Sequence, residues 1–171
     1  AAHMLGVRLD NINIGPAMSE FATMLKPFFE GTNSGIAEEN IQSRTRGLTL
    51  MALSNKFGHM VLSTGNKSEM SVGYATLYGD MCGGYSVLKD VYKMAVFDLS
   101  RWRNGHKPLG AVGPDGPVMP ERIITKPPSA ELRPDQKDED SLPPYELLDA
   151  ILIGLVENER PIDALIADGY D

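Results

Sequence analysis

A short run of largely apolar residues, 59–62, leads directly into a turn of polar side chains at 63–69. Buried strands of parallel sheets often end in this way, because the carboxyl end of the strand delivers polar groups to a ligand. The turn carries hydroxyls, an amide, a cation and a carboxylate, all of which suit a nucleotide. The sequence therefore predicts a buried strand at 59–62 with a nucleotide site at its end.

The segments before this run alternate between strand and helix patterns. Residues 7–14 alternate apolar and polar side chains, which is the period of a half-buried strand. Helical spacing follows at 17–29 and at 37–57, with Gly58 as the stop signal of the second helix. The order strand, helix, helix, strand favours a parallel α/β sheet with right-handed crossovers.

The remaining predicted elements are helices around one long irregular segment. Residues 1–5 read as the last turn of a helix, and apolar spacing predicts further helices at 91–103, 145–157 and 161–167. Residues 105–144 carry most of the prolines and a cluster of acids. We therefore expect that segment to be a mobile lid or loop.

Composition excludes several classes of function. The 171 residues suit one domain, and a net charge of −7 without a basic stripe speaks against nucleic acid as a partner. The single cysteine, Cys82, excludes an internal disulfide and a cysteine-cluster metal site. It also favours a reducing compartment, so we expect the cytoplasm. No apolar run approaches the roughly 20 residues that a membrane span needs.

Three residues in the helical segments point to an anionic ligand. Arg44 lies on the apolar stripe of its own helix, and Asn40 lies one turn earlier on nearly the same face. Together they form a donor pair that suits phosphate or ribose oxygens. Lys93 falls in a first helical turn, where a cation opposes the helix dipole unless an anion such as phosphate is present. For each side chain, simple exposure to solvent is the alternative.

The polar turn also has an alternative interpretation as a plain connection from strand to helix. Thr64 would then be the helix cap, and Glu69 would lie in the first helical turn. A phosphate-binding P-loop is excluded, because Asn66 separates Gly65 from Lys67.

Longer motifs resemble a known family. The run STGNKSEMSVGYATLYGDMCGGYSVLKDVYK at 63–93 and the segment 101–104 are similar to the synthetase domain of glutamine-dependent NAD synthetase, an N-type ATP pyrophosphatase. The segment KPPSAEL at 126–132 resembles the lid signature of that family. The resemblance covers nearly the whole chain. It implies part of a single adenine-nucleotide-hydrolase-like α/β domain, with a parallel sheet and flanking helices.

The resemblance also implies roles for individual residues. Contacts with ATP are implied for Thr64, Lys93, Ser129 and Lys126. Contacts with the substrate deamido-NAD are implied for Asn40, Arg44 and Glu69. The family also places magnesium at Glu69, and Arg46 is a secondary candidate for the dinucleotide.

The activity implied by the resemblance is that of a carbon–nitrogen ligase. ATP adenylates the nicotinate carboxylate of deamido-NAD, and ammonia then displaces AMP to give NAD. In this family a glutaminase domain releases the ammonia from glutamine, and synthetase domains pair as homodimers. That domain and the Ser-Gly-Gly-x-Asp-Ser pyrophosphate loop do not occur in these 171 residues, so we expect the chain alone to be inactive. The alternatives are another amidating ATP pyrophosphatase, such as a GMP synthetase, or a non-catalytic binding or dimerisation fragment.

Overall fold

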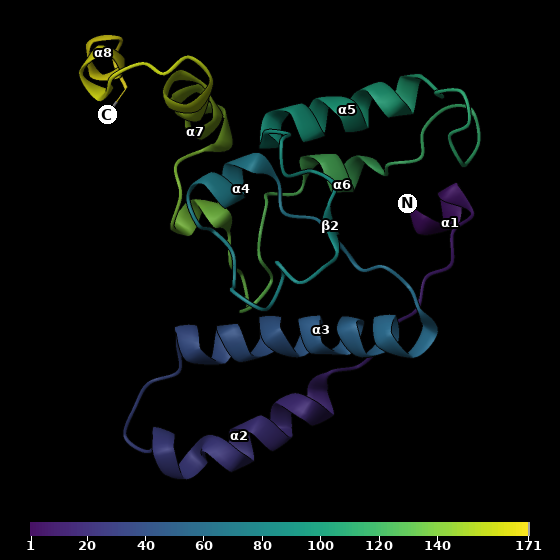
Figure 1. Ribbon diagram of the computed structural model, residues 1–171, viewed down its shortest axis with the longest axis vertical. Coiled ribbons are helices and arrows are strands. Elements are labelled where there is room, and N and C mark those ends of the chain that lie inside the picture. Colours follow the sequence, from purple (N-terminus) through teal and green to yellow (C-terminus); the bar gives the residue numbers. More distant parts are fainter. Residues whose placement is uncertain (171) are drawn as a thin grey trace. The chain divides into compact units, whose positions relative to one another are not determined.

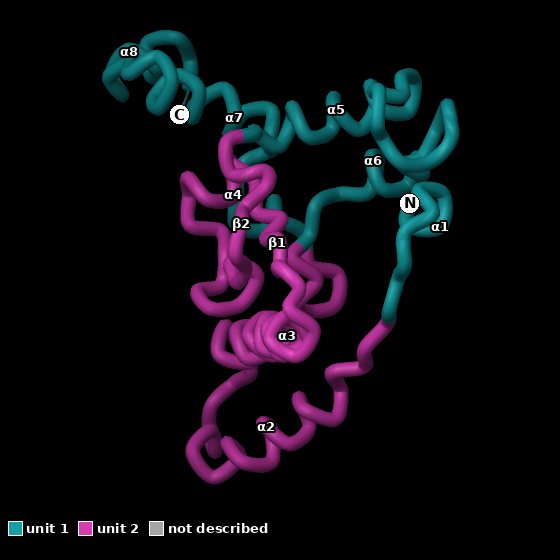
Figure 2. Tube along the Cα trace, turned by 45° about the vertical axis from the view of Figure 1, so that its right-hand side comes forward, with its two compact units in different colours: residues 1–10, 91–129, 137–171 teal, residues 11–90, 130–136 magenta. Residues whose placement is uncertain are grey.

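The computed structural model describes residues 1–170, which fold as two compact units (Figure 2). Unit 1 contains residues 1–10, residues 91–129 and the chain from residue 137 onward. Unit 2 contains residues 11–90 and 130–136. Among the described residues, no helix is both long enough and apolar enough to cross a membrane.

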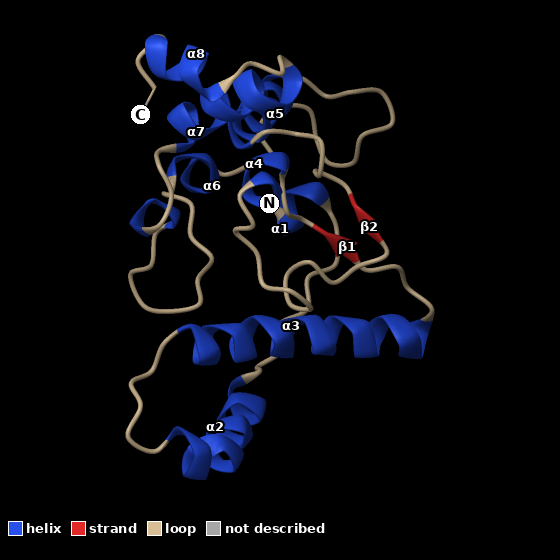
Figure 3. Ribbon diagram, turned by 60° about the vertical axis from the view of Figure 1, so that its left-hand side comes forward, coloured by secondary structure: helices blue, strands red, loops and turns tan. Residues whose placement is uncertain are grey.

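Unit 2 combines a pair of helices with a short parallel strand pair (Figures 1 and 3). Its elements are α2 (Gly15–Phe29), α3 (Ile36–Phe57), β1 (Leu62–Ser63), α4 (Lys67–Ser71) and β2 (Tyr85–Ser86). Both predicted helices are confirmed. Helix α3 ends where Gly58 takes a left-handed φ of 68°, a conformation that favours glycine. The two strands pair in parallel, with Leu62 opposite Tyr85 and Ser63 opposite Ser86.

Two expectations about strands are wrong. Residues 7–14 lie outside every helix and strand, and residues 7–13 are exposed. Alternation alone does not make a strand, because a strand also needs a neighbour for its backbone hydrogen bonds. Within the described part of the chain, the sheet contains β1 and β2 alone. The strand predicted at 59–62 is reduced to β1, where Leu62 is 52% exposed rather than buried.

Unit 1 is helical. Its elements are α1 (Ala2–Leu5), α5 (Lys93–Gly105), α6 (Glu121–Thr125), the 3-10 helix η1 (Asp138–Asp140), α7 (Tyr145–Leu152), the π-helix η2 (Ile153–Glu157) and α8 (Ile162–Ala167). The helices predicted at 1–5, 91–103 and 161–167 are confirmed. The helix predicted at 145–157 is also confirmed, although its last five residues widen into η2.

The core of unit 1 lies along one face of α7. Its buried members are Tyr145, Leu148 and Leu152, and the partly buried side chains of Tyr92, Met94 and Leu142 pack against them. This core joins the start of α5 to α7, so it fixes the position of the residue that begins α5.

The proline-rich segment 105–144 contains ordered elements as well as loops. It includes α6, η1 and the buried side chains of Val118 and Ile124. Asn104 anchors its first half, because its Oδ1 accepts hydrogen bonds from the N–H groups of Val118 (2.9 Å) and Met119 (2.8 Å). The last turn of α5 therefore sets the path of the chain that follows it.

Candidate functional site

A small hollow of about 40 Å³ lies beside the carboxyl ends of β1 and β2. Ser63 and Ser86, the last residues of the two strands, line it, and their Oγ atoms lie 2.6 Å apart. The carboxylate-bearing residues Glu69 and Asp80 line the same hollow. Ligands of parallel α/β proteins bind at this edge of the sheet.

The polar turn after β1 is a helix start. Asn66 is the cap of α4: its Oδ1 accepts from the Glu69 N–H at 3.0 Å, and Glu69 Oε2 accepts from the Asn66 N–H at 3.1 Å. This reciprocal capping box fixes the position of the Glu69 carboxylate. The alternative in which Thr64 caps the helix is wrong, because Thr64 is exposed and lies two residues before the cap.

Helix α3 orients the loop that carries Asp80. The Ser43 hydroxyl donates to Asp80 Oδ1 at 3.1 Å and accepts from the Asp80 N–H at 3.2 Å. The same Oδ1 accepts from the Thr76 N–H at 2.7 Å. Asp80 is thus held by three hydrogen bonds beside the hollow. Asp80 is not among the predicted site residues, and the glycines around it at 79, 83 and 84 are the sequence signal that points to it.

Two glycines allow this close approach of helix and loop. A Cβ on Gly47 would lie 2.8 Å from the carbonyl oxygen of Gly79, and a Cβ on Gly79 would collide with the Ser43 hydroxyl. Neither position has room for a side chain. The absence of side chains at both positions lets Ser43 reach Asp80.

Asn40 and Arg44 contact the same loop. Asn40 Oδ1 accepts from the Thr76 hydroxyl at 3.1 Å, and Arg44 Nε donates to the Leu77 carbonyl at 3.1 Å. Arg44 is exposed and also lines an apolar hollow of about 350 Å³ between α2, α3 and the loop. Unit 2 therefore places Asn40 and Arg44 on one side of the 76–80 loop, and that loop also carries Asp80.

Lys93 begins α5 in unit 1, where a carboxylate of the chain itself meets the helix start. Asp149, which is 4% exposed, accepts from the Met94 N–H at 2.8 Å. Lys93 Nζ lies 4.9 Å from the centre of the Tyr145 ring. The anion that the helix dipole favours is thus present without a phosphate. Sequence analysis missed Asp149, because it lies 55 residues further along the chain.

The two predicted ATP contacts of the lid, Lys126 and Ser129, belong to the same unit as Lys93. The Asp138 N–H donates to the Pro128 carbonyl at 2.9 Å, and the Tyr145 hydroxyl donates to Asp138 Oδ2 at 2.7 Å. Ser129, which is partly buried, follows Pro128 directly, and Lys126 is exposed just after α6. Tyr145 and Asp138 therefore link Lys93 to Pro128, the residue before Ser129.

The predicted site residues thus divide between the two units. Asn40, Arg44, Thr64 and Glu69 lie in unit 2, and Lys93, Lys126 and Ser129 lie in unit 1. Among the described residues, no three His, Cys, Asp or Glu side chains gather to hold a metal. Magnesium sites need only one or two protein carboxylates, with water and phosphate as the other ligands. Glu69 and Asp80, both at the hollow, fit that pattern.

A parallel strand pair with flanking helices and polar groups at its carboxyl edge defines an incomplete α/β protein of the nucleotide-binding type. The chain belongs to the NAD synthase family, whose sequence model matches residues 1–170. This membership confirms the resemblance seen in the turn and lid motifs, and it also confirms the fold class.

Two relatives show how much of the family's length the chain spans. The glutamine-dependent NAD(+) synthetase of Xanthomonas campestris pv. campestris (strain 8004) is 56% identical over 166 residues, which cover 97% of this chain and 29% of the relative. The enzyme of the same name from Acinetobacter baylyi is 54% identical over 170 residues, or 30% of its length. The chain is therefore similar to less than a third of each relative.

Two solved structures of NAD and NMN synthetases are also similar to this chain. The glutamine-dependent NAD+ synthetase of Acinetobacter baumannii in complex with adenosine diphosphate matches 99% of this chain and 28% of its own, with 46% identity and a TM-score of 0.66. The NMN synthetase of Francisella tularensis matches 90% of this chain and 57% of its own, with 28% identity and a TM-score of 0.75.

Proposed function

We propose that this chain is part of a synthetase domain that converts deamido-NAD to NAD with ATP and ammonia. The family match over residues 1–170 supports this proposal most directly. The ADP complex of the Acinetobacter baumannii relative supports ATP as the nucleotide. As in the named relatives, glutamine would be the source of the ammonia.

The reaction has two displacements. A carboxylate oxygen of deamido-NAD attacks the α-phosphorus of ATP, and pyrophosphate leaves with the electrons of the broken P–O bond. Ammonia then attacks the carbonyl carbon of the acyl adenylate, loses a proton and expels AMP. Neither step needs a covalent enzyme intermediate, so the protein contributes position and charge.

We assign the dinucleotide to unit 2. Arg44 and Asn40 would bind its phosphate or ribose oxygens, and Glu69 would lie at the substrate. Glu69 and Asp80 would hold Mg²⁺, which screens phosphate charge when it is bound. The hydrogen bonds from Ser43, Thr76 and the α4 cap fix both carboxylates and support this assignment.

We assign the remaining ATP contacts to Lys93, Lys126 and Ser129 in unit 1 and to Thr64 in unit 2. The cations would offset the charge that gathers as the carboxylate approaches the phosphate. In this proposal, residues 105–144 act as a lid that excludes water and so protects the acyl adenylate from hydrolysis.

We also propose a cytoplasmic homodimer that pairs through α3. Large apolar side chains of this helix are exposed, among them Ile36 (76%), Leu48 (66%) and Phe57 (62%). Exposed apolar surface of this kind marks protein interfaces. Sedimentation of the synthetase domain as a monomer at micromolar concentration would contradict the dimer.

Substitution of Arg44 in the full-length enzyme tests the function. Arg44→Ala should raise the KM for deamido-NAD about 10-fold to 150-fold, the range for one hydrogen bond to a charged group, and should leave the KM for ATP nearly unchanged. Arg101→Ala is the control, because Arg101 is exposed and pairs with Asp98 on its own helix. Pyrophosphate release is measured with ATP and ammonia.

The same assay separates the alternatives. Nicotinate mononucleotide and a GMP synthetase substrate replace deamido-NAD in parallel reactions, the first because an NMN synthetase is among the structural neighbours. Faster pyrophosphate release with either compound would overturn the proposed substrate. Equal constants for Arg44→Ala and the parent enzyme would overturn the role of Arg44.

A further inference from the structure

Helix α3 carries a polar stripe that the proposed reaction does not use. Glu39, Gln42 and Arg46 follow one another at intervals of three and four residues, so they lie on one face of the helix. This face differs from the one formed by Asn40, Ser43 and Gly47, which packs against the loop at 76–80. All three side chains of the stripe contact residues 130–136.

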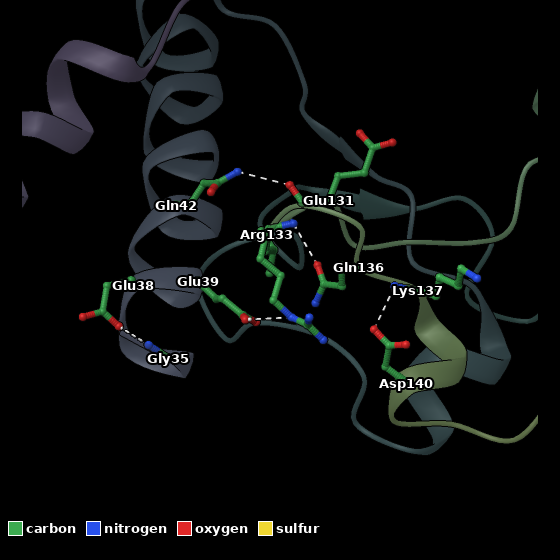
Figure 4. Close-up of polar contacts among 10 residues, drawn as sticks. Gly35, Glu38, Glu39, Gln42, Glu131, Arg133, Gln136, Lys137 and Asp140 are labelled. Atoms are coloured by element: carbon green, nitrogen blue, oxygen red, sulfur yellow. Dashed lines mark hydrogen bonds and ion pairs between the residues drawn. The ribbon is translucent and has the colours of Figure 1, made fainter. Parts of the chain in front are cut away.

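Two of the three contacts meet at the backbone of Glu131. Gln42 Nε2 donates to the Glu131 carbonyl oxygen at 3.2 Å, and Arg46 Nη2 donates to the same oxygen at 3.0 Å. A carbonyl oxygen has two lone pairs, so it accepts both donors. Arg133 Nε lies 3.4 Å from Glu39 Oε1 (Figure 4).

Residues 130–136 have an unusual backbone shape where they contact α3. Glu131 and Asp135 have φ values of 53° and 55°, a left-handed conformation that residues other than glycine rarely adopt. The Leu132 N–H donates to Gln136 Oε1 at 2.9 Å inside this segment. Such a backbone persists only where surrounding contacts maintain it, and the donors of α3 supply those contacts.

We propose that Gln42 and Arg46 are positioning residues that dock residues 130–136 onto α3. The expected ATP contact Ser129 directly precedes this segment in the chain, and the expected dinucleotide contacts Asn40 and Arg44 lie on α3 itself. Docking therefore holds the segment that follows Ser129 in the chain on α3, the helix to which we assign the dinucleotide. This inference rests on the proposed function, and it assigns Arg46 to the lid rather than to the dinucleotide.

The three contacts should contribute unequally to the docking of residues 130–136. The Glu39–Arg133 pair is partly exposed, with side-chain exposures of 24% and 48%, and pairs of this kind contribute little. The Arg46 bond carries a full charge and should dominate, with Gln42 second. Arg46→Lys keeps the charge but loses the planar donor geometry, so it should rescue only part of the effect.

The test uses the full-length enzyme and two measurements. Without nucleotide, Arg46→Ala should speed backbone hydrogen exchange at 130–136 about 5-fold to 10-fold, less than for a buried charged donor because the Arg46 bond is exposed to solvent. In kinetics the same variant should raise the KM for ATP by a similar factor and leave the KM for deamido-NAD unchanged. Lys56→Ala is the control, because it removes another exposed cation from α3 and should change neither measurement.

Each outcome decides the question. A raised KM for deamido-NAD with unchanged exchange would show that Arg46 binds the dinucleotide and would overturn the inference. Faster exchange with both KM values unchanged would overturn it as well, because the contact would then be merely structural. Gln42→Ala carries the same test if Arg46→Ala does not fold. Exchange needs no substrate, so failure of the proposed reaction is recognised separately.

Discussion

Substitution of Tyr145 by phenylalanine tests how the core of unit 1 holds a buried carboxylate. Asp138 is 3% exposed, and its Oδ2 accepts from the Tyr145 hydroxyl at 2.7 Å. Within the described residues, its Oδ1 has no hydrogen-bond partner. The Tyr145 hydroxyl is therefore the donor that stabilises the buried carboxylate of Asp138.

The expected loss of stability follows from the groups that Tyr145→Phe leaves in place. Tyr145→Phe retains the ring that packs with Leu148 and Leu152, so no cavity forms. The change removes one hydrogen bond to a charged group and leaves the acceptor buried, which costs about 1.5 to 3 kcal/mol. We expect the upper half of that range, because Oδ1 of Asp138 has no hydrogen-bond partner within the described residues.

Urea unfolding of the parent protein and of the variant measures this difference from the midpoint and the slope. Tyr92→Phe is the matched control, since the Tyr92 hydroxyl donates to the exposed Glu157 at 3.0 Å and its loss should cost at most about 1 kcal/mol. Equal losses for the two variants would refute the dependence of Asp138 on Tyr145. In a double-mutant cycle, Asp138→Asn should reduce the effect of Tyr145→Phe.

Two further substitutions test unit 2 by urea unfolding. Gly47→Ala should destabilise by up to about 2 kcal/mol, because a Cβ 2.8 Å from the Gly79 carbonyl oxygen outweighs a gain of about 1 kcal/mol in helix propensity. Gly105→Ala is the control, because its Cβ would meet open space and the protein should not be destabilised. A stabilising effect of Gly47→Ala would contradict the close approach of α3 to the loop at 76–80. Asn66→Ala should lower the free energy of unfolding by about 1 to 2 kcal/mol, because α4 loses the cap that accepts from the Glu69 N–H. Asn66→Asp should retain this cap. Equal losses of stability for the two variants would count against the capping role of Asn66.

Local signals in the sequence predicted the helices well. The apolar spacing of α2 and α3 and the glycine after α3 act within a few residues, and the structure confirms both helices and the end of α3. The buried residues of α3 are nevertheless Ser43, Thr45 and Gly47 rather than its apolar stripe. The turn and lid motifs also established the family, because their order of residues is specific. Membership of the NAD synthase family was therefore determined by the sequence alone.

Contacts between distant residues were not predictable in this way. Ser43 orients Asp80 across 37 positions, Asp149 meets the start of α5 across 55, and Arg46 reaches Glu131 across 85. Such pairs leave no period in the sequence, because the fold rather than local spacing brings the partners together.

The strand predicted at 7–14 is absent for the same reason, because strand formation also depends on contacts between distant residues. Its alternation is a property of the sequence, but a strand forms only when a neighbour accepts its hydrogen bonds, and these residues are largely exposed without one. The sequence by itself predicted six of the helices, the glycine that ends α3 and the family, but it did not predict α4, α6 or η1 as helices. Tertiary structure decided which polar groups meet, because hydrogen bonds between distant residues exist only after the chain has folded.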